Sequence, residues 1–417
     1  MNHRSLIRHR DFRHLWAGDA ISQVGTMITT LAVPLLAVRT LQATPFEVGL
    51  LTTFQFLAFL LIGLPAGAWV DRLRRRNVMI IADLGRVLTL GSIPVAGAVG
   101  VLTIWQLYAV VLLTGALTVF FDVSYQSYLP FLVGREHLVE GNAKLQGTQS
   151  VAQVAGPSVG GFLVQLIGAP YAIALDAASY LWSALWVGTI RSREPTPQPT
   201  DRRLVHEIRE GVGFIVRHPI LRAIAGGTAT SNLWSSAAEP VLIVLLARQL
   251  DLSAGVIGAL FSAAAVGGLL GALLARRLAH RIGEGPIIWI SMALSWPLAF
   301  IQPFLHRDWT LGAFVITQIV WTAGAVIYNV TQVSFRQAVC PERLLGRMNA
   351  TMRFIVWGTM PIGGLIGGAL GSLAGVRTTL LITAAGGSLA FLWLYLSPLR
   401  RMHALPTRPE EEAAEQH

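Results

Sequence analysis

The sequence has little charge and almost no cysteine. Of its 417 residues, 13% are charged and 53% are hydrophobic, and Cys340 is the single cysteine. Soluble globular chains carry about 25% charged residues, so this chain has too few to cover a water-exposed surface. One cysteine excludes a disulfide framework and a cysteine-bound metal cluster. The composition thus excludes an ordinary soluble enzyme, a disulfide scaffold and a disordered chain, and indicates an integral membrane protein with many spans.

The sequence also lacks the motifs of several enzyme classes. It contains no H-E-x-x-H pair, no G-x-x-x-x-G-K-[ST] phosphate loop and no G-x-S-x-G elbow, which zinc proteases, ATP-driven motors and serine hydrolases would need. We therefore predict a protein that is not an enzyme and that uses no cofactor and no metal. An intramembrane enzyme and a receptor or scaffold are the alternatives of a different class.

Twelve segments are long and apolar enough to cross a membrane. A spanning helix needs about 20 apolar residues, and an even number of spans places both termini on one side. The predicted spans are 14–38, 46–70, 77–99, 104–132, 138–167, 170–190, 220–247, 254–279, 285–305, 309–338, 343–373 and 376–397.

Positive charge predicts the orientation of these spans. If the N-terminus is inside, about 26 of the 32 Lys and Arg residues lie in inner segments and four lie in outer loops, as the positive-inside rule requires. The basic N-terminal arm has no small-residue cleavage site, so we expect it to remain as a cytosolic arm. Since Lys144 is the only lysine, arginine use suggests a GC-rich bacterial genome. We predict a multi-pass protein of the bacterial inner (cell) membrane with both termini cytoplasmic, embedded in lipid, monomeric and not bound to nucleic acid.

The two halves of the chain resemble each other at an offset of about 205 residues. Gly67 aligns with Gly271, and Gln126 aligns with Gln332. Parallel six-helix repeats are an architecture of transporters, so we predict an all-α fold of two pseudo-symmetric six-helix bundles. The helical pattern after the proline-rich linker predicts a helix on the membrane surface, or equally a solvated linker helix. The predicted parts are an N-terminal bundle (1–190), a cytosolic linker (191–219), a C-terminal bundle (220–398) and a cytosolic tail (399–417).

Polar side chains recur at helical spacing on the first, fourth, seventh and tenth spans. Polar groups in hydrocarbon are unfavourable and usually face protein or water. A stripe on every third span predicts a central aqueous cavity for a small-molecule substrate; hydrogen bonding between helices, without a substrate path, is the alternative. The predicted cavity-lining residues are Ser22, Gln23, Thr26, Thr118, Tyr125, Asn232, Ser235, Gln318, Thr322, Asn329 and Gln332.

Three carboxylates lie on these stripes. Asp19, Asp122 and Glu239 could exchange a proton with whichever side of the membrane the cavity faces, so they are the candidates for proton coupling. The alternative for each is a hydrogen bond that helps helices to pack. Of the other charged groups in spans, Asp83 and Arg86 are three residues apart and predict a structural ion pair. Asp176, with Tyr180, is interpreted as a structural contact.

One short loop carries a recognisable motif. The segment GAWVDRLRRR at 67–76 resembles G-x-x-x-D-R-x-G-R-R, the loop signature of the major facilitator superfamily, except that Arg74 replaces a glycine. The physical role would be a latch in which Asp71 gains and loses bonds between conformations; setting topology by positive charge is the alternative. The residues of this predicted latch are Gly67, Asp71, Arg72, Arg75 and Arg76.

A second motif, GPSVGG at 156–161, resembles the antiporter signature of the same superfamily through Gly156, Pro157, Gly160 and Gly161. With FRHLW near the start and ADLGR in the third span, it is similar to the branch of macrolide-efflux proteins and enterobactin exporters. The resemblance implies a rocker-switch antiporter that couples proton entry to multidrug, macrolide or siderophore-like efflux. Uptake of a nutrient or lipid-like solute is the alternative, and the fourth span lacks the arginine that many drug/proton antiporters carry.

Overall fold

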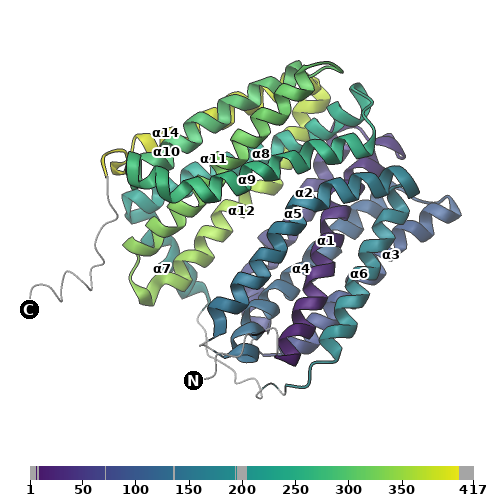
Figure 1. Ribbon diagram of the computed structural model, residues 1–417, viewed down its shortest axis with the longest axis horizontal. Coiled ribbons are helices and arrows are strands. Elements are labelled where there is room, and N and C mark those ends of the chain that lie inside the picture. Colours follow the sequence, from purple (N-terminus) through teal and green to yellow (C-terminus); the bar gives the residue numbers. More distant parts are fainter. Residues whose placement is uncertain are drawn as a thin grey trace, which may run out of the picture. The chain divides into compact units, whose positions relative to one another are not determined.

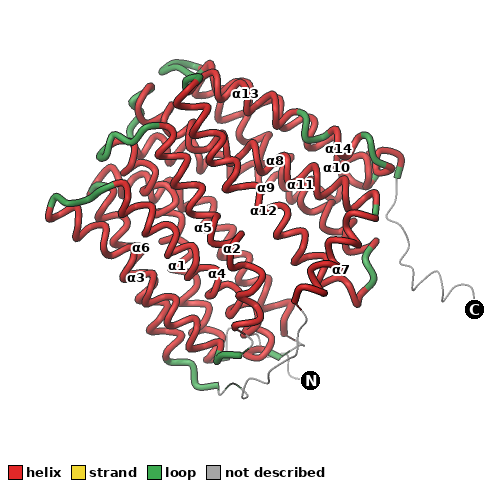
Figure 2. The backbone as a smooth tube through the Cα atoms, turned by 180° about the vertical axis from the view of Figure 1, so that it is seen from behind, coloured by secondary structure: helices red, strands yellow, loops and turns green. Residues whose placement is uncertain are grey.

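The protein is all-α in the part that the structure describes. The computed structural model describes residue 6 and residues 9–70, 72–134, 137–192, 194 and 204–402, and these residues form helices and loops without a strand. Figure 2 shows the helices in red, joined by short loops. The all-α prediction is confirmed.

The helices follow the predicted spans closely. In Figure 1 they run from purple to yellow along the chain. Three spans have a second, shorter part: η3 continues α8, η4 continues α10, and α14 follows α13. The helices are α1 (Arg10–Arg39), α2 (Pro45–Val70), α3 (Arg75–Val99), α4 (Ile104–Val133), α5 (Leu138–Ile167), α6 (Ala169–Gly188), α7 (Leu204–Arg217), α8 (Pro219–Val244), η3 (Leu245–Gln249), α9 (Ala254–Ile282), α10 (Glu284–Ser295), η4 (Trp296–Phe304), α11 (Thr310–Val339), α12 (Glu342–Leu373), α13 (Val376–Ser388), α14 (Leu392–Tyr395) and η5 (Pro398–Arg401).

Most of these helices suit a membrane. Within the described residues, ten are long and apolar enough to span one. The remaining two predicted spans, α6 and α8, are 20 and 26 residues long, which is enough for a hydrocarbon core of about 30 Å at about 1.5 Å per residue. Their mean hydropathy is lower because α6 carries Asp176 and four serine or tyrosine side chains, and α8 carries the polar stripe that ends at Glu239.

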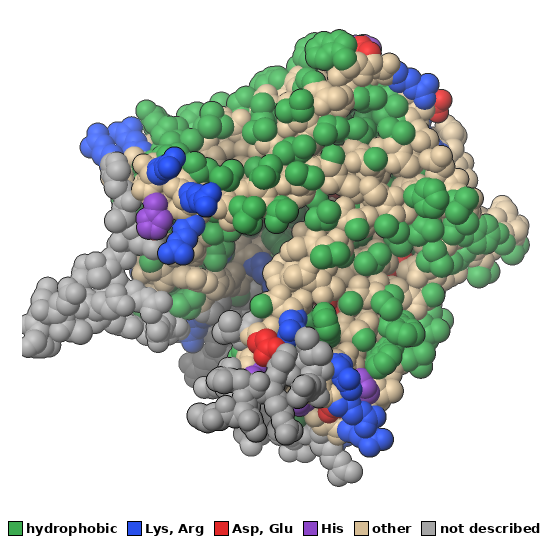
Figure 3. All heavy atoms as spheres, viewed as in Figure 1, with side chains coloured by type: hydrophobic (Ala, Val, Ile, Leu, Met, Phe, Trp, Pro, Cys, Tyr) green, Lys and Arg blue, Asp and Glu red, His purple; other side chains and the backbone are tan. Residues whose placement is uncertain are grey.

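Large apolar side chains lie on the outside of the helices. Leu88, Leu273 and Leu294 are largely exposed, and Trp105 and Trp309 are exposed near helix ends. Figure 3 shows such side chains spread over the helices of one face. A surface with this much exposed apolar area is stable in lipid and not in water.

The chain divides into two compact units. The first comprises residues 1–43, 54–202 and 251–262. Within it, α6 packs against α1, α3 and α5, and α3 also packs against α4. Its apolar core includes the fully buried side chains of Phe12, Leu15, Met79 and Tyr128. Because α1, α3, α4 and α6 are neighbours, polar groups on their inner faces can meet.

The second unit comprises residues 44–53, 203–250 and 263–417. Within it, α8 packs against α12 and α13, and α10 packs against α11. Helix α7 lies on α12 and α8, with Ile215 buried in the apolar core and Glu210 paired with Arg347. Helix α7 thus covers the end of the second unit through both apolar and charged contacts.

Candidate functional site

A buried ion pair lies at the centre of the first unit. Arg86 on α3 donates a hydrogen bond to Asp83, which lies one turn earlier on the same helix. Arg86 is 4% exposed and Asp83 is 0% exposed. The guanidinium carbon lies 4.0 Å from the ring centre of Tyr180 on α6 and 4.4 Å from that of Phe121 on α4. Aromatic faces attract a cation, and more strongly away from water. The predicted Asp83–Arg86 pair is therefore present, and it also joins α3 to α4 and α6.

Helix α1 brings a second carboxylate to this place. Asp19 is 5% exposed, and its Oδ1 accepts a hydrogen bond from Gln23 Nε2 at 3.2 Å. Asp19 interacts electrostatically with Asp122, Asp83 and Arg86. The structure thus brings together Asp19 and Asp122, two of the three predicted proton carriers, in one unit.

Helix α6 adds a third buried carboxylate, Asp176, which the sequence predicted to be only a structural contact. Asp176 is 0% exposed, and its Oδ1 accepts a hydrogen bond from Ser179 Oγ at 3.1 Å. Asp176 interacts electrostatically with Arg86. Tyr180, one turn further along α6, shares a hydrogen bond of 2.8 Å with Thr26 on α1. Helix α6 thereby connects the ion pair on α3 to the polar stripe on α1.

These groups form what we call the acidic cluster: Asp19, Asp83, Asp122, Asp176 and Arg86. With every group ionised, four carboxylates and one guanidinium carry a formal charge of −3. A low-dielectric interior opposes such an imbalance. Asp83 Oδ2, Asp176 Oδ2 and Arg86 Nε find no hydrogen-bond partner within the described residues. The arrangement can therefore take up protons, or a cationic substrate, to balance its charge.

The acidic cluster does not have the geometry of a metal site. The described residues contain no group of three or more His, Cys, Asp or Glu side chains placed to hold one ion. Asp83 is already bonded to Arg86, and Asp19 is bonded to Gln23. A proton fits this arrangement better, because it needs only one oxygen atom at a time.

On α1 and α4, several of the predicted cavity residues bond to their own helix. Ser22 is buried and donates to Asp19 O at 3.1 Å. Thr26 and Thr118 donate to backbone oxygens one turn earlier, at 2.9 and 2.8 Å. Tyr125 Oη is buried, interacts with Asp19 and Asp122, and has no hydrogen-bond partner among the described groups. Tyr125 is therefore the stripe residue of α4 that points to the acidic cluster.

Some stripe residues of the second unit also bond to protein. Asn232 on α8 donates to Val356 O on α12 at 3.3 Å, and Gln332 on α11 donates to Asn329 Oδ1 at 3.4 Å. Glu239 has an exposed side chain. Ser235, Gln318 and Thr322 are half-buried, as is Asn232, and Asn329 is exposed. This unit thus places its predicted carboxylate apart from any buried ion pair of the kind found in the first unit, as far as the described residues show.

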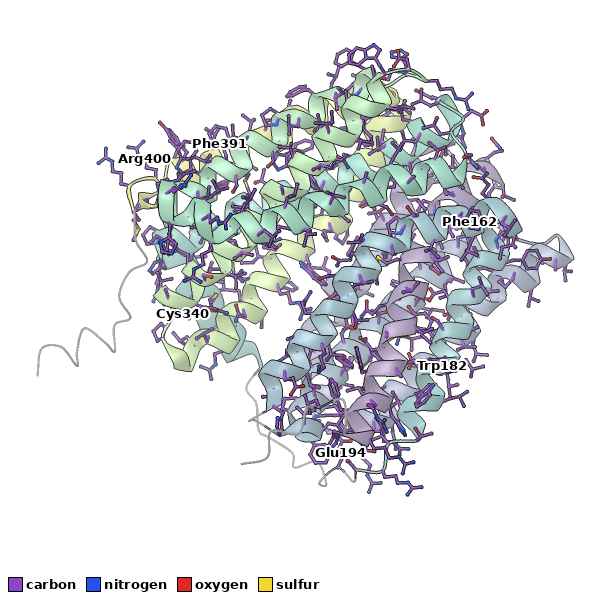
Figure 4. The ribbon with its side chains drawn as sticks, viewed as in Figure 1. Phe162, Trp182, Glu194, Cys340, Phe391 and Arg400 are labelled. Carbon is purple, nitrogen blue, oxygen red and sulfur yellow. The ribbon has the colours of Figure 1, made fainter. Side chains whose placement is uncertain are left out.

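The loop motif between α2 and α3 binds the end of α6. Arg76 donates through Nε to Val187 O at 3.1 Å, through Nη2 to Gly188 O, and through its backbone N–H to Glu194 Oε2 at 3.2 Å. Arg75 also lies 4.0 Å from Glu194, which Figure 4 labels beyond the end of α6. Asp71 lies outside the described residues, and Arg72 is exposed. The basic residues of the motif thus bind carbonyls and a carboxylate at one end of the first unit.

The glycine motif on α5 lets two helices approach closely. A Cβ atom at Gly160 would lie 3.0 Å from Ile28 Cα on α1, and one at Gly156 would overlap Met27. On another side, a Cβ at Gly161 would lie 3.0 Å from Gly258 Cα near the start of α9. Small residues permit such backbone contacts in membranes. The motif therefore acts as a packing surface of the first unit.

Comparison with known proteins agrees with this architecture. A family model described as a transmembrane secretion effector matches residues 4–417. The chain belongs to this family of the major facilitator superfamily. The resemblance seen in the sequence motifs is thereby confirmed, and the protein is a membrane transporter and not an enzyme.

Individual relatives cover nearly the whole chain. The enterobactin exporter EntS of Escherichia coli O1:K1 / APEC is 28% identical over 423 residues, covering 97% of this chain and 96% of EntS. EntS of Shigella boydii serotype 18 is also 28% identical, with the same coverage. Among solved structures, a bacterial homologue of the iron transporter ferroportin has a TM-score of 0.74 at 16% identity, covering 94% of this chain and 99% of that one. The nucleoside transporter NupG has a TM-score of 0.73 at 13% identity, covering 92% and 99%. These two structures show the shared fold.

Sequence reasoning missed Asp176 as a member of the cluster. The signal was present, because Asp176, Ser179 and Ser183 lie three and four residues apart and so share one face of α6. That face was not counted because only every third span was expected to carry polar stripes. The packing of α6 on both α1 and α3 turns this short polar face toward the others.

Proposed function

We propose that this transporter exports small amphipathic molecules and that entry of protons into the cell drives the export. The observation that carries the proposal is the acidic cluster, in which three buried carboxylates and the half-buried Asp122 share one guanidinium. Ionisable groups within membrane spans commonly mark ion pathways. A cluster with excess negative charge binds protons when it faces one side and releases them when its surroundings change.

Siderophore-like molecules are the first substrates to test. EntS is an enterobactin exporter with 28% identity to this chain along nearly its whole length. Drugs and macrolides belong to the same broad class of amphipathic compounds. The polar stripes of α1 and α4 in the first unit, and those of α8 and α11 in the second, are the candidate residues for contact with such molecules. Uptake of a nutrient or lipid-like solute would appear in the same assay as flux in the opposite direction.

In this proposal two six-helix bundles alternate between outward and inward openings. Asp19 and Asp122 carry protons in the first unit, and Glu239 on α8 is the carrier in the second. The loop residues Arg75 and Arg76 act as a conformational latch where they bind the end of α6. Proton binding reduces the negative charge of the acidic cluster. Substrate binding accompanies the return of the transporter to its other opening.

Flux through reconstituted protein tests the proposal. Ligands are first found by thermal shift of the purified full chain and are then tested for transport in proteoliposomes with an imposed pH gradient. We expect the gradient to drive uphill substrate movement. Asp19→Asn and Asp122→Asn should each reduce that movement about tenfold, which corresponds to about 1.4 kcal/mol of coupling, while substrate binding is spared. A wild-type flux that does not change with the pH gradient would contradict proton coupling.

The proposed orientation has both termini in the cytoplasm of a monomer in the inner membrane. A background with Cys340→Ser allows single cysteines to report it. We expect a membrane-impermeant maleimide to label Ser253→Cys, before α9, in intact cells. The matched control His280→Cys, near the other end of α9, should react only after lysis. Both positions flank the same helix, so the reverse labelling pattern would indicate the opposite orientation in the membrane.

A further inference from the structure

Asp176 is a fully buried carboxylate without an ion-pair partner in the described part of the chain. Its Oδ1 accepts one hydrogen bond, from Ser179 on its own helix, at 3.1 Å. Its Oδ2 has none there. A buried carboxylate is unfavourable unless it is paired, bonded on its remaining lone pairs, or neutral. Asp176 therefore differs from Asp83, which has Arg86, and resembles Asp19, whose Oδ1 also accepts a hydrogen bond from a neutral side chain on its own helix.

The nearby charges do not balance Asp176. Helix α6 packs against α1, α3 and α5. From α3 come Asp83 and Arg86, which are bonded to each other, and from α1 comes Asp19. On α5, Glu140 and Lys144 lie in the first turns and pair with each other at 3.5 Å. The one cation that acts on Asp176, Arg86, is thus already bound to another carboxylate.

Helix α1 lies directly on the Asp176 carboxylate. A Cβ atom added at Gly25 of α1 would overlap Asp176 Oδ1 and Ser179 Oγ. Thr29, one turn further along α1, lies within hydrogen-bonding reach of the Asp176 carboxylate, although Thr29 Oγ1 and Asp176 Oδ2 make no hydrogen bond of normal geometry among the described atoms. Thr29 thus provides the hydroxyl group of α1 that is placed to bond to this carboxylate.

A proton would resolve this arrangement. We propose that Asp176 is a proton-binding residue of the transport cycle, and that its protonation changes the hydrogen bond between α6 and Thr29 of α1. The carboxylate takes one proton from water, becomes a neutral carboxylic acid, and donates from Oδ2 to Thr29 Oγ1. Release of the proton restores a charge next to Gly25 and reverses that bond, so that Thr29 donates to the carboxylate. The inference rests on the proposed proton coupling and adds a carrier on α6.

Infrared difference spectroscopy of the full chain in lipid nanodiscs tests proton binding without requiring transport. As pH is stepped, the wild type should show a carbonyl band from a buried protonated carboxyl group. Asp176→Asn should remove that band. The matched control Asp308→Asn, in an exposed loop between η4 and α11, should leave it unchanged. A band that persists unchanged in Asp176→Asn overturns the proposal.

A second variant covers the case in which Asp176→Asn does not fold. Thr29→Val keeps the shape of the side chain but removes the hydroxyl, so the band should shift in frequency while the protein stays folded. An unshifted band in a folded Thr29→Val protein overturns the link between α1 and α6. A residue that only helps packing would not move this band.

A transport assay then distinguishes a failure of this inference from a failure of the proposed function. In folded Asp176→Asn, gradient-driven uphill flux should fall about tenfold, as expected for the loss of about one pKa unit of coupling, while substrate exchange without a gradient continues. If the wild type shows no gradient-driven flux but its band depends on Asp176, the proposed function fails and the proton site stands. If the wild type is gradient-driven and the band does not depend on Asp176, the further inference fails alone.

Discussion

The guanidinium of Arg86 lies 4.0 Å from the ring centre of Tyr180 while it binds Asp83 on its own helix. An arginine within a span is tolerated when carboxylates and aromatic faces replace its water. Through these contacts one side chain of α3 packs against the ring of Tyr180 on α6 and the ring of Phe121 on α4. Arg86 is thus the structural centre of the acidic cluster.

Removal of Arg86 alone should destabilise the protein strongly. Arg86→Met leaves Asp83 buried and unpaired, and breaking a buried pair in this way costs about 3–5 kcal/mol. The measurement is the unfolding free energy in mixed micelles. The double variant Asp83→Asn/Arg86→Met removes both charges, so it should be more stable than the sum of the single effects predicts. Strict additivity would show that the two side chains act independently.

Close packing of α5 and α9 should depend on Gly258. A Cβ there would overlap Pro157 O and lie 3.0 Å from Gly161 Cα, and backbone atoms cannot move aside easily. We expect Gly258→Ala to destabilise the protein by about 1–3 kcal/mol.

The matched control for this packing prediction is Gly91→Ala on α3, where a Cβ meets no heavy atom within 4 Å. This change should be neutral or stabilise by up to about 1 kcal/mol. Thermal unfolding in detergent compares the two variants. Equal effects would mean that helix propensity, and not the α5–α9 contact, controls the outcome.

The latch motif should act through Arg76. Arg76→Ala removes the donors bound to Val187 O and Gly188 O, and the loss of these hydrogen bonds should cost about 1–3 kcal/mol. Arg72→Ala is the control, because the Arg72 side chain is exposed and should change stability little.

For Asp71 we expect a folded Asp71→Asn variant with reduced transport, because the substitution keeps the shape of the side chain and removes its charge. Flux normalised to the amount of folded protein in the liposomes is the measurement. Normal efflux by that variant would mean that the motif sets topology only.

His218 should make stability depend on pH at the start of α8. Burial lowers the pKa of His218 below its usual value of 6.5, and its Nδ1 accepts a hydrogen bond from the backbone N–H of Leu221 at 3.4 Å. The folded state therefore prefers the neutral ring. Its contribution is complete above pH 6.5 and is lost as pH falls from the unfolded pKa toward the lower folded pKa.

The variant His218→Asn keeps a good N-cap without a titrating group. Stability measured between pH 8 and pH 5 should fall less in this variant than in the wild type, by about 1 kcal/mol or less. Parallel curves for the two proteins would show that His218 does not contribute to the pH dependence.

Much of the fold was predictable because membrane spans are local features of the sequence. The predicted segment 104–132 and the helix Ile104–Val133 agree closely, since apolar length and flanking turns define both. The predicted segment 285–305 covers α10 and η4, but the change to a 3-10 helix at Trp296 was not predicted. Pro297 lacks the backbone N–H that an α-helix would use there, and its effect depends on neighbouring helices.

The candidate site was only partly predictable. Asp19 and Asp122 follow from stripes on single helices, and the Asp83–Arg86 pair follows from spacing on one helix. Asp176 was interpreted as a structural contact, because its role depends on which helices surround α6. Stripe residues such as Asn232 were predicted to line a cavity, yet Asn232 bonds to Val356 O of another helix. Spacing along a helix identifies a polar face but not what that face meets.

By itself, the sequence determined the number of spans, the all-α class and the family motifs. These depend on apolar length, charge in short loops and residues that are close along the chain. The tertiary structure decided that Asp176 joins Asp19, Asp83 and Arg86, and that Gly25 of α1 lies on its carboxylate. Such contacts join residues more than 60 positions apart, and they depend on how helices pack in three dimensions, which helical periodicity does not specify.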